Sequence, residues 1–178
     1  MKRVRLHFES VQQIMGAEGL SVVLMTDEEK KRVLSVVCDE QATQQLLMRL
    51  RNPKACRTLL PEVLFEMLTS TYEIMIYGIH DGQYQVVLYD TQFQQTVRVR
   101  MSDAILLSLI TKSTPLYIEQ KLMEQQSIPY DPHATGIAIP INTMDSHRLS
   151  EALQHAIDDE NYELASYIRD EINRRKKG

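Results

Sequence analysis

The chain has 178 residues, 43% of them hydrophobic, with a formal net charge of -4 and only two cysteines. This composition is sufficient for a buried core without disulfides or a structural metal, and it excludes a nucleic-acid binder of the uniformly basic kind. No apolar run reaches the roughly 20 residues of a membrane-spanning helix, and no continuous apolar stretch follows the basic start, so neither a membrane span nor a signal peptide is expected.

The first part of the chain predicts a strand, a β-hairpin and two helices. Residues 4–8 alternate as a strand does, and the apolar runs 21–25 and 33–37 flank a charged turn, which indicates a hairpin. A helix of about 10 residues is expected after Asp39, because apolar residues recur there at helical spacing, at Ala42, Leu46, Leu47 and Leu50. A second helix is expected to begin at Pro61 and to bury an inner face made of Val63, Leu64, Met67 and Leu68.

The middle of the chain has the clearest strand pattern. Residues 74–79 and 84–89 flank His80-Asp81-Gly82, and an Asp-Gly pair between apolar runs is typical of a β-hairpin. Alternation over 96–100 predicts a further strand with one solvated face. Ser102 then resembles a helix N-cap, with Asp103 in the first turn. The face expected to be buried consists of Ile105, Leu106, Leu109 and Ile110, and a strand (115–118) and a short helix (119–126) follow.

These elements predict an α+β fold in which a mixed or antiparallel sheet packs against helices. Proline and glycine without periodicity indicate a linker over 131–145, after a domain of residues 1–130. Beyond the linker, two apolar repeats predict a helical hairpin over 146–178, with Asn161 capping its second helix. Two short helices bury too little surface to be stable alone, so we expect the hairpin to pack on its own domain, a second copy or a partner.

Cysteine and histidine do not form a metal-binding pattern. Cys38 and Cys56 match neither a zinc-site nor a Cys-x-x-Cys spacing, so we expect two buried free thiols in a cytoplasmic protein. A disulfide or a redox role is the alternative. The histidines are scattered and none is paired at i, i+4, so a histidine-based metal site is not expected; they are His7, His80, His133, His147 and His155.

A series of ordered blocks between Ser21 and Asp131 resembles the bifunctional nuclease family, whose members are credited with DNase and RNase activity. Arg57–Leu64 is similar to the family's Arg-Pro-Leu-Thr-His-Asp-Leu-Leu, and Arg100–Ile105 is similar to Arg-Pro-Ser-Asp-Ala-Ile. Further matching blocks are 21–24, 76–88 and 115–118. The family's His-Asp pair corresponds to Pro61-Glu62 here, and a family Glu corresponds to Gln41. The resemblance implies hydrolysis of phosphodiester bonds in DNA or RNA, and the alternative is a catalytically degenerate regulatory or adaptor protein.

Carboxylates and arginines in these blocks are the candidate catalytic residues. Phosphodiester hydrolysis needs acid–base groups and a cation beside the charge that develops on phosphorus. Glu62 and Asp103 are the candidates for acid–base groups or for ligands of a metal such as Mg²⁺ or Mn²⁺, with Arg57, Arg100 and Ser102 beside them. For an enzyme we expect Glu62, Asp103, Arg57 and Arg100 to line one cleft. If these side chains point to different faces, the adaptor alternative is favoured. The alternative is structural, with Asp103 stabilising the first turn of a helix and pairing with Arg100.

The chain contains a local basic segment although its net charge is negative. No acidic residue interrupts the stretch from Arg49 to Arg57, and Arg98 adds charge on a predicted strand. Cations that lie close together in space can bind successive phosphates of a nucleic-acid backbone. We therefore expect nucleic-acid binding by Arg49, Arg51, Lys54 and Arg98. A solvated loop face is the alternative.

The last 33 residues resemble the UVR motif, a helical hairpin through which bacterial excision-repair proteins contact one another. The matching positions are Leu149, Leu153, Ala156, Tyr162, Glu163, Ala165, Ser166, Arg169, Asp170 and Ile172. The resemblance implies a protein partner bound through Tyr162, Ala165, Arg169 and Asp170, and we also expect a homo-oligomer. The alternative is that the hairpin caps its own domain.

Overall fold

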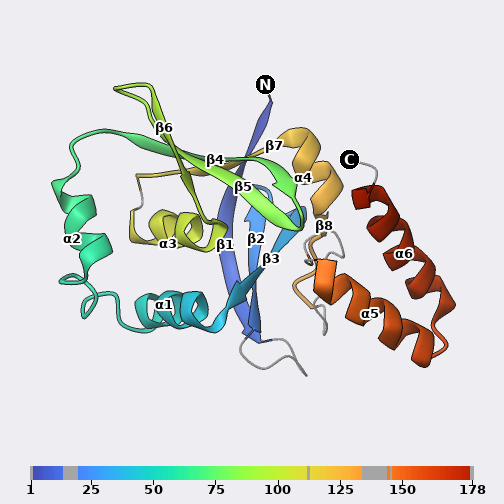
Figure 1. Ribbon diagram of the computed structural model, residues 1–178. Helices are drawn as coiled ribbons and strands as arrows, with labels where there is room; N and C mark the ends of the chain where they lie inside the picture. The colour runs from blue at the N-terminus through green and yellow to red at the C-terminus, as the bar shows by residue number, and fades with distance from the viewer. Residues whose placement is uncertain (1, 14–19, 112, 134–143, 145, 177–178) are drawn as a thin grey trace.

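The computed structural model describes residues 2–13, 20–111, 113–133, 144 and 146–176. Within these residues the chain forms one mixed sheet in the order β6-β5-β4-β7-β1-β2-β3-β8 (Figure 1). The strands are β1 (Arg3–Gln13), β2 (Leu20–Asp27), β3 (Arg32–Asp39), β4 (Tyr72–His80), β5 (Gln83–Asp90), β6 (Gln95–Val99), β7 (Leu116–Glu119) and β8 (Ile128–Pro129). The predicted α+β class is therefore confirmed.

Two antiparallel groups of strands meet at β7. β1 pairs with β2 and β2 with β3, while β4 pairs with β5 and β5 with β6, all antiparallel. β7 lies between the groups, antiparallel to β1 and parallel to β4. The β4–β5 turn is the predicted Asp-Gly turn, in which Asp81 has φ 46° and Gly82 has φ 73°, the positive values that a type I′ turn requires.

Two helices cover one face of the sheet and help to close the core. α1 (Glu40–Arg51) begins after Asp39, whose carboxylate accepts a hydrogen bond from the Ala42 amide at 2.7 Å. α3 (Met101–Ile110) packs beside α1 and against β5. The fully buried side chains at the centre of the domain include Met25, Leu34, Leu46, Ile74, Ile76, Ile105, Leu116 and Ile118.

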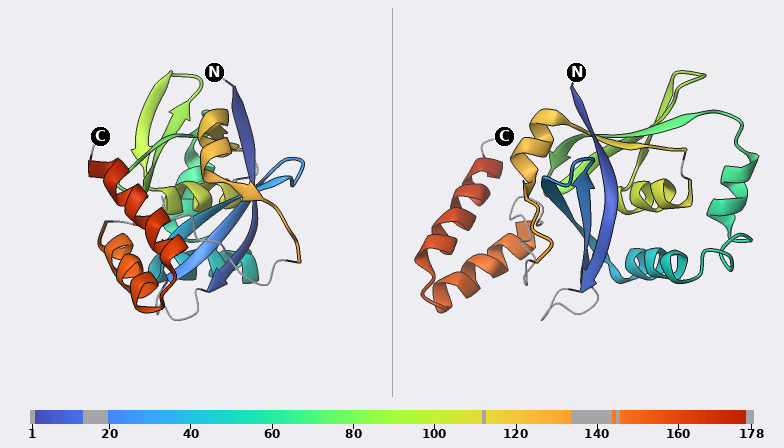
Figure 2. Two further views of the ribbon diagram at one scale, coloured as in Figure 1. Left: turned by 90° about the vertical axis from the view of Figure 1, so that its right-hand side faces the viewer. Right: turned by 180° about the vertical axis from the view of Figure 1, so that it is seen from behind.

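The remaining helices lie around the margin of the sheet. α2 (Leu60–Met67) is on the side of α1 and α3, and α4 (Gln120–Gln126) packs on β7 and β1. α5 (Ser146–Asp158) and α6 (Tyr162–Lys176) form the predicted hairpin on the opposite side of the sheet, as Figure 1 and the reversed view in Figure 2 show. None of the described helices is long and apolar enough to cross a membrane.

Two expectations about helices were wrong. The predicted inner face of α2 is exposed, with exposed fractions from 38% at Val63 to 73% at Met67, because α2 turns its polar face toward the domain. Ser102 is not the N-cap of α3. The helix begins earlier, at Met101, so Arg100 occupies the cap position and no side chain caps the helix end.

The C-terminal hairpin has a small core of its own. Leu149, Ala156, Ala165 and Ile168 are buried against one another, and Leu153 and Ile172 pack beside them. α6 begins directly after Asn161, whose backbone carbonyl accepts from the Ala165 amide at 3.0 Å. Most of the predicted linker, residues 134–143 and 145, lies outside the described residues.

The hairpin contacts the domain at the β4–β5 turn. The Ser146 hydroxyl donates to an Asp81 carboxylate oxygen at 2.8 Å, and a guanidinium nitrogen of Arg175 lies 3.6 Å from the same carboxylate. Asp81 is 60% exposed, so these two polar contacts are accessible to solvent.

Both cysteines are free and buried, as predicted. Burial raises the pKa of the Cys38 thiol to about 12, with a smaller contribution from the nearby Asp39 carboxylate.

Candidate functional site

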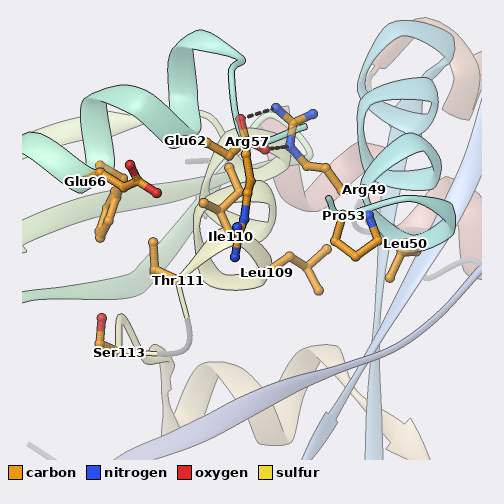
Figure 3. Close-up of a pocket in the computed structure, with 11 residues that line it drawn as sticks. Arg49, Leu50, Pro53, Arg57, Glu62, Glu66, Leu109, Ile110, Thr111 and Ser113 are labelled. Atoms are coloured by element: carbon orange, nitrogen blue, oxygen red, sulfur yellow. Dashed lines mark hydrogen bonds and ion pairs between the residues drawn. The ribbon is translucent and has the colours of Figure 1, made fainter. Parts of the chain in front are cut away.

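A cavity of about 460 Å³ opens where α1 and α3 end and α2 crosses them. Its polar lining comes from Arg49, Arg57, Glu62, Glu66, Thr111 and Ser113, and we call it the arginine pocket (Figure 3). Leu109 and Ile110 of α3 supply an apolar floor. The pocket thus combines cations, carboxylates and hydroxyl groups in one open space.

The wall of the arginine pocket is fixed by a buried ion pair between α1 and α2. The Arg49 guanidinium donates to both oxygens of Glu62, at 2.6 and 2.9 Å (Figure 3). It also donates to the side-chain and backbone oxygens of Gln45, at 2.8 and 3.0 Å. The side chains of Arg49 and Glu62 are only 6% and 12% exposed. A bidentate pair of this kind fixes α2 in one orientation.

Arg57 and Glu66 line the same pocket from exposed positions. Glu66 forms no ion pair with any residue that the structure describes, so its carboxylate remains available to a ligand. It lies one helical turn after Glu62, on the same face of α2. Sequence reasoning missed Glu66, although its i, i+4 spacing from Glu62 is a signal that could have identified it.

A second cavity, of about 300 Å³, lies at the other ends of α1 and α3. Arg100 and Ser102 line it together with Asp39, which caps α1, and Arg148 from α5. We call it the amino-end pocket. Asp103 accepts hydrogen bonds from Arg100 at 2.9 and 3.2 Å, and these bonds raise the pKa of the Arg100 guanidinium. Both partners are well exposed, so the pair is screened by water.

The structure does not bring the five predicted catalytic residues into one pocket. Glu62 and Arg57 line the arginine pocket, whereas Arg100 and Ser102 line the amino-end pocket and Asp103 pairs beside it. α3 separates the two groups, because Ser102 lies in its first turn and Thr111 follows its last. At 1.5 Å per residue the separation is about 13 Å.

The predicted nucleic-acid-binding residues are divided in a similar way. Arg51, Lys54 and Arg98 are exposed, as a phosphate contact requires. Arg49 differs from these three, because it is buried and hydrogen-bonded to Glu62 and Gln45. A local charge count could not detect this, because Glu62 lies thirteen positions further along the chain.

The carboxylates do not fit a metal held by the protein alone. Among the described residues, no three or more His, Cys, Asp or Glu side chains gather closely enough to hold a metal ion. Both oxygens of Glu62 already accept from Arg49.

The hairpin residues expected to bind a partner differ in exposure. Tyr162 is 68% exposed, and Arg169 and Asp170 are exposed on α6. Ala165 is buried between α5 and α6, where its small side chain lets the helices approach. Ala165 therefore serves the packing of the hairpin, and its expected contact with a partner is not supported by this burial.

Comparison with known families gives two matches. A bifunctional nuclease domain model matches residues 22–131, and a UvrB/uvrC motif model matches residues 147–177. The first match covers more than half of the chain and includes both pockets apart from Leu20 and Arg148. No curated protein matches the chain.

Proposed function

The chain belongs to the bifunctional nuclease domain family, and on that premise we propose that its domain hydrolyses phosphodiester bonds of DNA or RNA at the arginine pocket. The observation that carries the proposal is the convergence of Arg57 with Glu62 and Glu66 on one open cavity. A cation for the phosphate and a carboxylate for the proton are the groups that this reaction requires.

In the proposed mechanism Arg57 binds the non-bridging oxygens of the phosphate and stabilises the charge that develops on them. Glu66 accepts a proton from a water molecule, whose oxygen attacks phosphorus. The bond from phosphorus to the leaving oxygen then breaks, and that oxygen takes a proton from solvent. Glu62, held by Arg49, positions α2 and thereby places Glu66.

We propose that the amino-end pocket and the exposed cations bind further phosphates of the same strand. Ser102 and Thr111 are about 13 Å apart along the α3 axis, which equals the axial rise of roughly four duplex steps at 3.4 Å per step. Asp103 orients Arg100 in this arrangement. Arg51, Lys54 and Arg98 contribute further contacts, and two buried free thiols agree with a reducing cytoplasmic location.

The test is cleavage of labelled single- and double-stranded DNA and RNA, each with Mg²⁺, with Mn²⁺ and with EDTA. Glu66→Gln and Arg57→Ala should each lower the rate by about 100-fold or more. Matched controls are Glu28→Gln and Arg5→Ala, which replace exposed residues outside both pockets. Full activity in Glu66→Gln would refute the assignment of Glu66, and absence of cleavage in every buffer would refute the reaction.

A non-catalytic adaptor is the second candidate function. It is favoured by the arginine partners of Glu62 and Asp103 and by the position of Asp103 outside the arginine pocket that Glu62 lines. In that function the domain binds nucleic acid without cleaving it, and the UvrB/uvrC motif captures a protein through Tyr162, Arg169 and Asp170. Binding that is retained without cleavage in any tested buffer would select this function.

A further inference from the structure

The amino-end pocket has walls from both parts of the chain. Arg100 and Ser102 line it from the start of α3, and Arg148 lines it from the start of α5 in the C-terminal hairpin. Arg148 lies within the residues that the UvrB/uvrC motif model matches. The hairpin therefore contributes a cation to a cavity of the preceding domain.

The two carboxylates in the lining of this pocket are already engaged by other groups. Asp39 caps α1 and accepts a hydrogen bond from the Ala42 amide at 2.7 Å. Asp81 accepts from the Ser146 hydroxyl at 2.8 Å and lies 3.6 Å from a guanidinium nitrogen of Arg175. Their negative charges are thus partly compensated by the helix end and by Arg175, which does not line the pocket.

The arginines of the amino-end pocket are suited to a phosphate. Nε and one terminal nitrogen of Arg100 donate to Asp103 at 2.9 and 3.2 Å, and a guanidinium has more N–H donors than these two bonds use. The Arg100 side chain is 74% exposed, and Arg148 is half-buried. Because planar guanidinium groups bind phosphate oxygens through parallel hydrogen bonds, two of them on one cavity of about 300 Å³ favour a phosphate ligand.

We propose that the hairpin is part of the nucleic-acid site, and that Arg148 binds a phosphate of the strand in the amino-end pocket together with Arg100. The inference rests on the proposed function, and it adds a residue of the UvrB/uvrC motif to the site that holds the strand. The contacts of Ser146 and Arg175 with Asp81 hold the hairpin beside the pocket.

The remaining contact between hairpin and domain is loose. A groove of about 800 Å³ lies between them, lined by α4 and the β4–β5 turn on one side and by α5 and α6 on the other. A strand that binds both Arg100 and Arg148 adds a further link across this boundary. By thermodynamic linkage, nucleic acid then stabilises the docked hairpin by as much free energy as docking adds to nucleic-acid binding.

Fluorescence anisotropy of a labelled single-stranded oligonucleotide, titrated with the full chain over a series of salt concentrations, tests the contact. Phosphorothioate linkages keep the charge of the strand and resist hydrolysis, so binding is measured apart from cleavage. Arg148→Ala should raise the dissociation constant about 10-fold and lower the slope of its salt dependence by about one, because one phosphate contact is lost. Arg148→Lys keeps the charge and should keep the slope. The control Arg5→Ala replaces an exposed arginine outside the pocket and should change neither quantity.

The outcomes separate this inference from the proposed function. An unchanged slope in Arg148→Ala would overturn the inference. If Arg100→Ala weakens binding and Arg148→Ala does not, the pocket binds the strand without the hairpin, and only the inference fails. A slope lowered by Arg148→Ala in a chain that does not cleave would support the inference while refuting the proposed hydrolysis.

Hydrogen exchange tests the reciprocal effect. The same oligonucleotide should slow the exchange of backbone amides in the first turns of α5 in the wild-type chain, and this protection should be lost in Arg148→Ala. Equal protection of α5 in both chains, or protection in neither, would also overturn the inference.

Discussion

The stability of the domain should depend on the ion pair between Arg49 and Glu62, and Glu62→Gln tests this dependence. The substitution keeps the size of the side chain and removes the charge opposite a guanidinium that is 6% exposed. Removing one partner of a buried pair costs roughly 3 to 5 kcal/mol, because the other charge stays buried without compensation. Arg49 keeps its two bonds to Gln45, so we expect the lower end of that range, about 3 kcal/mol.

Urea unfolding monitored by circular dichroism measures this loss in the free energy of unfolding. In thermal unfolding of a chain of this size, about 3 kcal/mol corresponds to a fall in Tm of roughly 9 °C. Arg49→Met combined with Glu62→Gln removes both charges and should cost clearly less than the sum of the two single variants. A loss below about 1 kcal/mol for Glu62→Gln, or strict additivity in the double variant, would show that the pair does not hold α2 in place.

Four further predictions concern other parts of the chain. Because both cysteines are buried and burial raises the pKa of Cys38 to about 12, the native protein should react with a thiol reagent at mildly alkaline pH only after unfolding. Leu149→Ala should cost about 3 kcal/mol within the hairpin alone, so hydrogen exchange should accelerate in α5 and α6 and stay unchanged in the sheet. Asp81→Asn tolerates the positive φ but loses the charge beside α6, so proteolysis should release the hairpin faster than in the wild type. The hydrogen bond from Lys30 lowers the pKa of Glu9 in the folded state. Ionised Glu9 therefore stabilises the fold above its unfolded pKa, and this contribution is lost as the pH falls through the folded pKa. In urea unfolding, Glu9→Gln should reduce the difference in the free energy of unfolding between about pH 7 and about pH 3.

Local patterns predicted the helices and every strand except the two-residue β8, because short-range physics determines them. The Asp-Gly pair requires positive φ angles that few other residues adopt, and this fixed the β4–β5 hairpin. Asp39 followed by an apolar repeat likewise located the start of α1.

The error at α2 has a different origin. Periodicity identifies an apolar stripe, but it does not determine what covers the stripe. Glu62 binds Arg49 across the space between two helices, and this long-range pair turns the polar side of α2 inward. The stripe with Leu64 at its centre is consequently exposed.

The expectation of one shared pocket failed for a similar reason. The motifs around Glu62 and Asp103 were correctly placed at helix starts, but their separation depends on how α2 lies across α1 and α3. No local rule gives that arrangement. Glu66 was overlooked because its i, i+4 spacing from Glu62 becomes informative only when the Arg49–Glu62 pair shows which side of α2 faces the pocket.

The position of β7 affects the order in which this domain can fold during synthesis. The strands on its two sides, β1 and β4, are made well before it, yet they do not pair with each other and join one sheet only through residues 116–119 between them. A ribosome-bound chain that stops short of Glu119 therefore holds two separate sheet fragments with open edges, which are prone to pair with other chains. Cooperative folding must wait until this late, four-residue strand has left the exit tunnel.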